Sequence, residues 1–487
     1  MRLNYLANGI GMTMIYTGLV LLVPVAVGLC YQEFNSILPF IISSFISFIL
    51  GFLVRKCQNA SNLENMNDIK KGEALFIVAL SWIVFSGLGC IPYLFFGLTP
   101  VNAIFESVSG ITTTGATILT HFDYPHSFFF WRSFTQWLGG LGIIVLFIAI
   151  LPQFAVAGRQ MFFAETPGPT EDKITPRIKN TASALWKVYL GLTLIEVAFL
   201  IWAGMPKFDA ICNSLSTLSA GGFSPHPESI IGYGSNSITW IVLVFMFIAG
   251  VSFNLQYKAL INKNPLILFK NEEFRVYFVM VLIMSTLIAI SLFIHNGFAF
   301  VDNIRNALFQ VISVTTSSGF ASVDFERWNY TSKMLLFIVM FMGACASSAG
   351  GGIKIARWLV VFKSMKSEIV KILHTNAIVN IKIDDKTVPS ETSRQIVVFV
   401  FFYFLIFGVT AVLLSIIEQN SAIGLGSAIS SLGNIGPGVA TLTGPLGNYE
   451  HLHESSKIIF IINMLVGRLE LIPFMVMLNK DFWRFKD

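Results

Sequence analysis

The chain has 487 residues, of which 54% are hydrophobic and only 12% are charged, and its mean hydropathy is +0.71. Because a soluble domain carries about 25% charged residues, this composition excludes an ordinary soluble enzyme and predicts an integral membrane protein. The net charge of +5 does not indicate nucleic-acid binding, because the basic residues concentrate in alternate loops, as they do in membrane proteins.

Ten apolar segments are each close to the roughly 20 residues that a bilayer requires, and we expect all of them to be helical. They cover approximately residues 10–31, 37–54, 73–97, 128–152, 184–205, 237–256, 275–295, 334–361, 396–417 and 457–478. Of the 32 Lys and Arg residues, 24 lie in the loops 55–72, 157–187, 258–275 and 354–394 and in the tail after residue 479. This distribution places both termini in the cytoplasm.

Four short polar segments share one frame. Aligned on Gly115, Gly222, Gly319 and Gly436, each has a serine six residues earlier: Ser109, Ser216, Ser313 and Ser430. A short helix is predicted before each turn, at 100–111, 207–218, 302–315 and 421–431, with polar residues for capping at Asn102, Asp209, Asp302 with Asn303, and Ser421. These helices are too short to cross a bilayer, so each enters it from the outer side only.

The four copies divide the chain into five parts. We expect a two-helix membrane hairpin at 1–60, followed by pore repeats at 61–170, 171–265, 266–385 and 386–487. The predicted fold class is an all-α integral membrane protein, with an N-terminal helix hairpin and four helix–pore loop–helix repeats around a pseudo-four-fold cation pore.

A short helix that ends inside the membrane directs its last carbonyls and the negative end of its dipole at that point, which favours a cation. Glycine then permits the positive φ that lets successive carbonyls face one axis, and a ring of carbonyls can replace the hydration shell of a monovalent cation. The predicted filter residues are Thr113, Thr114, Gly115, Ala220, Gly221, Gly222, Ser317, Ser318, Gly319, Asn434, Ile435 and Gly436. The alternative is that the segments are ordinary loops with turn residues.

The same motifs resemble a known family. Thr112–Thr117, Gly221–Ser224, Ser318–Phe320 and Asn434–Gly438 are similar to the pore loops of the TrkH/TrkG/KtrB superfamily of potassium transporters, and so are Trp137–Gly142, Glu165–Pro169, Gly350–Lys354 and Gly467–Glu470. The resemblance covers nearly the whole chain, and the additional N-terminal hairpin is typical of the TrkH branch. It implies potassium as the transported ion, a homodimer, and a cytosolic nucleotide-binding regulatory subunit of the TrkA type. None of the four loops reads Thr-Val-Gly-Tyr-Gly, so we expect only moderate selectivity against sodium.

Two features below the filter are predicted to form a gate. The segment from Gly343 to Gly352, with glycines at Gly343, Gly350, Gly351 and Gly352, would make a poor helix, because each glycine costs about 1 kcal/mol. We expect a flexible linker there, with Lys354 fixing its lower end. Arg468, inside the tenth span, would oppose cation passage. The alternatives are close packing of small residues and a structural ion pair of Arg468 with Glu470.

Several further residues receive weaker interpretations. We expect Arg132, Gln136 and Glu106 to hold the first short helix, and we leave Glu196 unassigned. The acidic and histidine residues Glu450, His451, His453 and Glu454 are interpreted as a solvated loop and not as a metal site. The loop 362–392 is expected to extend the eighth span as a helix and to turn near Asp384-Asp385. With 157–187 and 258–275 it forms a candidate docking face for the regulator, the alternative being topological charge with lipid headgroup contact.

The preferred function is potassium uptake through a gated, channel-like pore in the cell inner membrane, with K⁺ as the transported ion, membrane lipid around it and no covalent cofactor. The alternative is a proton- or sodium-coupled symporter, for which Glu196, Glu106 and Glu470 are the candidate titratable groups. An enzyme is not expected, because the sequence has no metal-ligand pattern, no nucleotide-binding loop and no convincing nucleophile–base pair.

Overall fold

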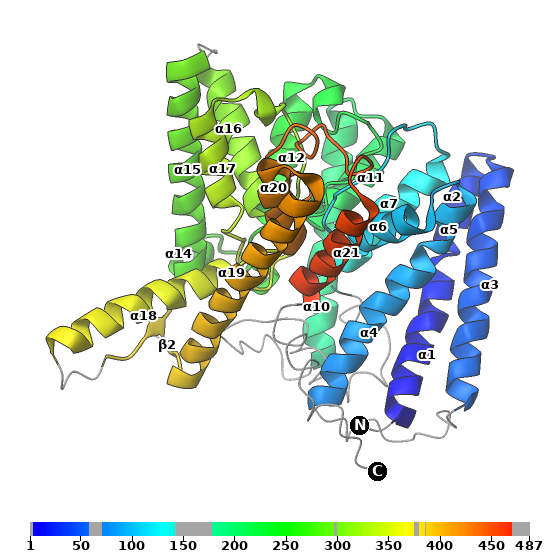
Figure 1. Ribbon diagram of the computed structural model, residues 1–487, viewed down its shortest axis with the longest axis horizontal. Helices are drawn as coiled ribbons and strands as arrows, with labels where there is room; N and C mark the ends of the chain where they lie inside the picture. Colours follow the sequence, from blue (N-terminus) through cyan, green and yellow to red (C-terminus); the bar gives the residue numbers. More distant parts are fainter. Residues whose placement is uncertain are drawn as a thin grey trace.

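The computed structural model describes residues 3–57, 71–140, 142, 178–296, 300–374, 379–384 and 386–469. Over these ranges the chain is helical apart from its connections and one two-stranded hairpin (Figure 1). The predictions for Glu470, for the motif 165–169, for most of the loop 157–187 and for the tail after residue 479 lie outside the described residues.

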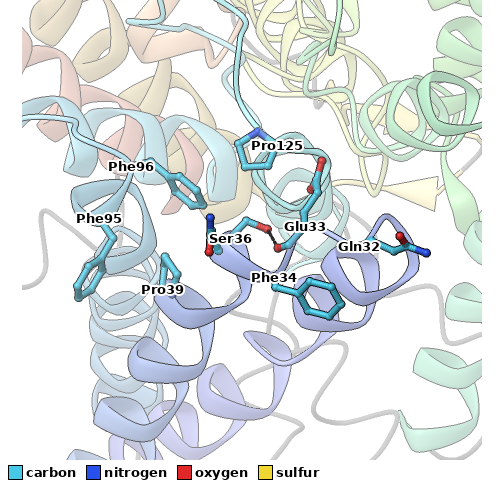
Figure 2. Close-up of a pocket in the computed structure, with 9 residues that line it drawn as sticks. Gln32, Glu33, Phe34, Ser36, Pro39, Phe95, Phe96 and Pro125 are labelled. Carbon is cyan, nitrogen blue, oxygen red and sulfur yellow. Dashed lines mark hydrogen bonds between the residues drawn. The ribbon is translucent and has the colours of Figure 1, made fainter.

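The N-terminal hairpin consists of α1 (Leu3–Val20), α2 (Val23–Cys30) and α3 (Phe34–Cys57). Small residues let α1 and α3 approach closely, as is common between membrane helices: a Cβ added to Gly11 or Gly51 would come within 3.0 Å of the other residue's backbone oxygen. At the turn before α3, the Glu33 carboxylate accepts a hydrogen bond from the His126 backbone N–H (3.1 Å). A pocket lined by Glu33, Phe96 and Pro125 lies at this junction (Figure 2).

The remaining helices follow the order of the four polar turns. The first group contains α4 (Lys71–Gly89), α5 (Ile91–Phe95), α6 (Pro100–Ile111) and α7 (His126–Gly140); the second contains α10 (Ile178–Trp202), α11 (Lys207–Leu218), η3 (Ile231–Tyr233), α12 (Asn236–Ala249), α13 (Phe253–Ile261) and α14 (Ile267–Lys270). The third contains α15 (Glu272–Asn296), α16 (Phe300–Thr315), η4 (Phe325–Arg327), α17 (Tyr330–Val339), α18 (Ile355–Leu373), β1 (Lys382–Ile383) and β2 (Lys386–Thr387). The fourth contains α19 (Ser390–Glu418), α20 (Ser421–Gly433) and α21 (Glu454–Leu469).

The four short helices α6, α11, α16 and α20 begin and end within two residues of the predicted positions. Their capping differs from the prediction. Asn420, not Ser421, caps α20, because its side chain accepts from the backbone N–H groups of Ala422 and Ile423. Thr99 and Pro206 stand at the N-caps of α6 and α11 without a side-chain capping bond.

Within the described ranges, six helices are long and apolar enough to cross a membrane, or seven if one bent pair counts as a single span. That pair is α12 and α13, which meet at 97°. The span predicted over 237–256 is therefore bent within its length, which the sequence did not indicate. Gly250 lies at the bend and allows it, because a Cβ there would come within 3.0 Å of the Tyr277 hydroxyl and of the Thr316 methyl group.

The predicted break in the eighth span is present. Helix α17 ends at Val339, and α18 begins only at Ile355. The chain between them is held at its base by a hydrogen bond from the Gly343 N–H to the Ile353 carbonyl (2.9 Å). Helix α18 then extends away from the bundle (Figure 1), and the chain returns through the β1–β2 hairpin with Asp384 in its turn. For the loop 362–392, the sequence predicted a helical extension of the eighth span and a turn near Asp384, and both are present.

Candidate functional site

The four polar turns have the same backbone conformation. In each turn, φ is positive at the glycine on which the four segments are aligned and also at the residue two positions before it. The values are 54° and 78° for Thr113 and Gly115, 57° and 78° for Ala220 and Gly222, 57° and 70° for Ser317 and Gly319, and 52° and 98° for Asn434 and Gly436. Because positive φ is uncommon for residues other than glycine, its occurrence at four equivalent positions marks one repeated structure.

A shared hydrogen-bond pattern explains why the short helices end there. Each turn contains two backbone hydrogen bonds. In the first turn, the Thr114 N–H donates to the Ser109 carbonyl and the Thr113 N–H donates to the Gly110 carbonyl, and the other three turns have the equivalent pair. The first kind of bond is made by Thr114 to Ser109 (2.9 Å), Gly221 to Ser216 (2.8 Å), Ser318 to Ser313 (2.8 Å) and Ile435 to Ser430 (2.9 Å). This is the Schellman arrangement of a helix C-terminus, and it turns the following backbone away from the helix axis.

The four turns contact one another in a closed cycle. A Cβ added to any of the four glycines would come closer than 3.0 Å to the carbonyl oxygen of the residue before the next glycine in the cycle. The pairs are Gly115 with Gly221, Gly222 with Ser318, Gly319 with Ile435, and Gly436 with Thr114. Each glycine therefore lies directly against a carbonyl of the neighbouring turn, and the structure brings the predicted filter residues together around one axis.

A surface pocket opens onto this ring. All four glycines, Gly115, Gly222, Gly319 and Gly436, line it, together with Thr117, Ser224, Pro437 and Tyr449 from the connections that follow the turns. The four turns therefore share one pocket.

Side chains behind the ring hold each turn differently. In the first and third turns, hydroxyl pairs bridge the turn: Thr112 with Thr114 (2.8 Å) and Thr316 with Ser318 (2.9 Å). In the second turn Gly221 has no side chain, and Gln136 fills that space, donating to the Gly221 carbonyl (2.7 Å) and accepting from the Phe223 N–H (3.1 Å). In the fourth turn the Asn434 amide donates to the Thr114 hydroxyl (2.9 Å).

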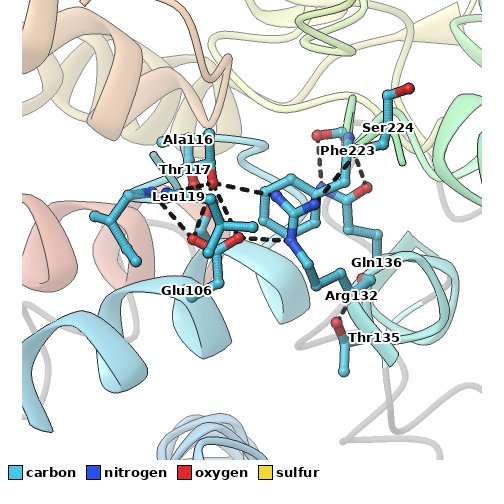
Figure 3. A network of polar contacts seen from close by, with 12 residues as sticks. Glu106, Ala116, Thr117, Leu119, Arg132, Thr135, Gln136, Phe223 and Ser224 are labelled. Carbon is cyan, nitrogen blue, oxygen red and sulfur yellow. Dashed lines mark hydrogen bonds and ion pairs between the residues drawn. The ribbon is translucent and has the colours of Figure 1, made fainter. Parts of the chain in front are cut away.

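A buried ion pair holds the first turn (Figure 3). The Arg132 Nε of α7 lies 2.7 Å from the Glu106 Oε1 of α6, and both side chains are almost completely buried. The Glu106 carboxylate also accepts from the Thr117 hydroxyl, and the guanidinium lies 4.0 Å from the centre of the Phe223 ring. Arg132 therefore links the first turn to the second, in agreement with the structural role predicted for this pair.

The loop between α17 and α18 packs against the ring from the other side. The Gly351 N–H donates to the Ser317 hydroxyl (2.6 Å), so one residue of the loop bonds directly to a ring residue. The loop also follows the α12–α13 bend: the Cys345 N–H donates to the Gly250 carbonyl (3.0 Å), and the Phe253 N–H donates to the Ser347 carbonyl (3.1 Å). The bend that the sequence did not predict is thus the surface on which this loop is held.

Small residues are required where the loop passes the helix ends. A Cβ on Gly350 would come within 3.0 Å of the Thr316 carbonyl, and one on Gly351 would meet the Gly433 carbonyl. Gly352 has a φ of 68°. The side chain of Lys354 is buried and donates to the Gly350 carbonyl, near the end of the loop that leads into α18.

Arg468 joins three parts of the molecule. From α21, its guanidinium donates to the Ala349 carbonyl in the loop (2.9 Å) and to the Gly139 carbonyl at the end of α7 (2.6 Å). Gly139 in turn packs against the Ile111 carbonyl at the end of α6. Arg468 therefore lies beside the predicted gating segment and close to the first short helix.

Some polar residues have partners that sequence reasoning missed. Glu450 belongs to the segment that was interpreted as a solvated loop, and it is partly exposed, but it also has partners that the sequence did not indicate. Its carboxylate lies 3.1 Å from the buried ammonium of Lys457 and accepts from the Asn102 amide (2.7 Å). This cluster joins the start of α6 to the start of α21 across about 350 residues of sequence, and no local pattern identifies it. Glu196, fully buried in α10, lies beside Thr217 of α11.

The helical spans and the four re-entrant helices define an all-α integral membrane protein with pore-loop repeats. A family model described as TrkH, cation transport protein, matches residues 41–483. The Trk system potassium uptake proteins TrkH of Salmonella typhimurium and Escherichia coli are 37% and 34% identical to this chain. The alignments cover 87% and 99% of the chain, and 88% and 100% of those proteins.

The same relationship is found among solved structures. The crystal structure of the potassium transporter TrkH from Vibrio parahaemolyticus is similar to this fold, with a TM-score of 0.88 and 30% sequence identity, over 99% of this chain and 100% of that one. The chain therefore belongs to the TrkH family of cation transport proteins.

The buried Arg132–Glu106 pair generates a stability prediction. Glu106→Gln should lower the free energy of unfolding by about 3 kcal/mol, because it leaves the Arg132 charge buried without its counter-charge. The melting temperature of the purified protein in detergent measures this. The control is Arg327→Gln, whose exposed side chain pairs with Asp324 at the surface and should cost little. Equal melting temperatures for the two variants would contradict the assignment.

Proposed function

We propose that this chain takes up potassium ions across the cytoplasmic membrane through a gated, channel-like pore whose filter is the ring of four turns. The observation that carries the proposal is the closed cycle, in which the carbonyls of Thr114, Gly221, Ser318 and Ile435 each lie against the glycine of the adjacent turn. Four turns in a closed cycle surround one axis, and their carbonyls can replace the water around a monovalent cation.

Potassium is favoured by the chemistry of the ring and by the relatives. The predicted ligands are uncharged backbone carbonyls, supported by the carbonyl ends of α6, α11, α16 and α20, which attract a cation without binding it permanently. The relatives in Salmonella typhimurium and Escherichia coli are named as potassium uptake proteins. An inward-negative membrane potential contributes about 2.3 kcal/mol per 100 mV to the entry of each ion.

The gate in this proposal is the loop from Gly343 to Lys354 together with Arg468. The loop bonds to a filter residue through Gly351 and Ser317, and Arg468 holds it through the Ala349 carbonyl. A cationic guanidinium next to the ion path opposes potassium electrostatically. Displacement of the loop would open the path below the filter.

The same proposal includes the location of the chain, its orientation in the membrane and its protein partners. The chain lies in the inner membrane with both termini in the cytoplasm and divides at the predicted repeat boundaries. We expect a homodimer, because α18 extends from the bundle and exposes Phe362, Met365 and Ile369. The loops 258–275 and 354–394 contact each other through Asn271 and Asp384, which supports one cytoplasmic docking face for a TrkA-type regulatory subunit.

A coupled symporter on the same fold is the second candidate. The observation in its favour is Glu196, a fully buried carboxyl group next to the second short helix. A carboxyl group at such a position is a candidate proton carrier in membrane transport.

The filter assignment predicts the effect of Gly222→Ala. This variant should reduce potassium flux into proteoliposomes at least about tenfold, because alanine is strained at positive φ and its Cβ would collide with the Ser318 carbonyl. The matched controls are Gly191→Ala and Gly408→Ala, whose Cβ atoms would meet nothing within 4 Å. Normal and equally selective flux in Gly222→Ala would rule the filter out.

The gate assignment predicts the opposite effect for Arg468→Ala. Basal potassium flux should rise about tenfold, because the loop loses a charge-assisted hydrogen bond and the path loses a positive charge. Deletion of residues 346–349 should act in the same direction. The control is Arg394→Ala, an exposed arginine on α19. Unchanged or lower flux at equal protein level would argue against the gate.

A third measurement separates the two functions. Potassium flux in proteoliposomes should follow the potassium gradient alone, be unaffected by an imposed pH or sodium gradient, and be kept in Glu196→Gln. Uphill potassium movement driven by a proton gradient, and its loss in Glu196→Gln, would instead establish the symporter.

A further inference from the structure

The first turn of α15 contacts the intramembrane loop through one side chain. Glu273, the second residue of this helix, is 9% exposed. Its Oε1 accepts hydrogen bonds from the backbone N–H groups of Ala346 (2.5 Å) and Ala356 (3.2 Å). Ala346 lies near the start of the loop and Ala356 lies just after it, so one carboxylate oxygen binds both ends of the segment.

The loop residue Lys354 completes this contact. Its ammonium group interacts electrostatically with Glu273 and also donates to the Gly350 carbonyl. Glu273 therefore opposes any movement that separates the two ends of the loop or withdraws it from α15.

The same helical turn is fixed on its other side by the β1–β2 hairpin. The Asp384 carboxylate accepts from the Glu272 backbone N–H (2.6 Å) and from the Asn271 side-chain amide. It thereby caps α15 from a segment more than 100 residues away. Lys363 of α18 adds a second connection, because it pairs with Glu272 and donates to the Lys382 carbonyl (2.6 Å).

We propose that Glu273 is a positioning residue that holds the intramembrane loop in its closed arrangement, and that the β1–β2 hairpin controls it through the Asp384 cap on α15. Withdrawal of Asp384 from this cap loosens the first turn of α15, and Glu273 then releases the loop. This inference rests on the proposed function, in which that loop is the gate.

The chemistry of the two N–H contacts provides a conservative test. Both bonds go to one carboxylate oxygen, and glutamine keeps an oxygen at that position. Glu273→Gln should therefore hold the loop nearly as the native residue does, whereas Glu273→Ala loses both bonds. A purely structural role for the side chain predicts reduced stability in both variants without a selective change in flux.

The first experiment measures potassium flux into proteoliposomes without any regulatory subunit. Glu273→Ala should raise basal flux about tenfold, the equivalent of about 1.4 kcal/mol, and Glu273→Gln less than threefold. Asp384→Ala should also raise it, and the Glu273→Ala/Asp384→Ala double variant should conduct no more than Glu273→Ala, because both substitutions act through one contact. The control is Glu368→Ala, an exposed residue of α18 paired only with Lys371 in the described structure.

The second experiment does not depend on ion flux. Cys345 is a buried residue of the loop, and its alkylation by a membrane-permeant maleimide, followed by peptide mass spectrometry, reports release of the loop. Alkylation should be several-fold faster in Glu273→Ala and Asp384→Ala than in Glu368→Ala, at equal melting temperature of the preparations.

The outcomes decide between the two proposals. Alkylation and flux at the control level in folded Glu273→Ala, or additive effects of the two substitutions, overturn the inference. The inference is also overturned if alkylation is faster but potassium flux does not change. If Gly222→Ala still reduces flux in that case, the filter assignment stands. If neither the wild-type chain nor Arg468→Ala passes potassium, the proposed function fails, and control-level alkylation in Glu273→Ala would then also refute the positioning role of Glu273.

Discussion

The structure depends on the contact between each ring glycine and a carbonyl of the next turn. The four short helices can converge only because no side chain stands at Gly115, Gly222, Gly319 or Gly436, where a Cβ would overlap the neighbouring backbone. The positive φ at these residues and two positions earlier then turns each chain out of its helix. Close packing and backbone direction thus impose the same residue at four places. This explains why the glycines persist in repeats that have otherwise diverged.

Outside that contact, the four repeats are supported in different ways. The first and third turns use paired hydroxyl groups, the second uses Gln136 from another helix, and the fourth uses Asn434. The difference is larger below the ring, where the second and third groups of helices are broken and fit together. The loop before Lys354 occupies the α12–α13 bend and bonds to the ring at Ser317. The four turns are therefore alike in conformation, whereas the segments that pack below them differ, and the proposed gate is one of these segments.

Local patterns predicted much of this fold. The serine and glycine frame located α6, α11, α16 and α20 to within two residues, because re-entrant helices have definite lengths and ends. The Gly-rich segment predicted the break after α17, because several glycines close together make a helix unfavourable. The bend at Gly250 was missed, since one glycine in an apolar run is compatible with a straight helix. Glu273 and the Lys457–Glu450–Asn102 cluster were missed because their partners lie up to several hundred residues away. Asn420 was missed because capping depends on the φ and ψ angles of a single residue.

In the proposed function, the carbonyls of Thr114, Gly221, Ser318 and Ile435 bind the transported ion. The most direct test is a structure determined with rubidium or thallium in place of potassium, in which the anomalous signal locates the ion. We expect an anomalous peak on the axis of the ring, within coordinating distance of these four carbonyl oxygens and absent when the ion is omitted. If the ring stays empty at a saturating ion concentration, or if only a site away from the ring is labelled, these carbonyls do not form the filter.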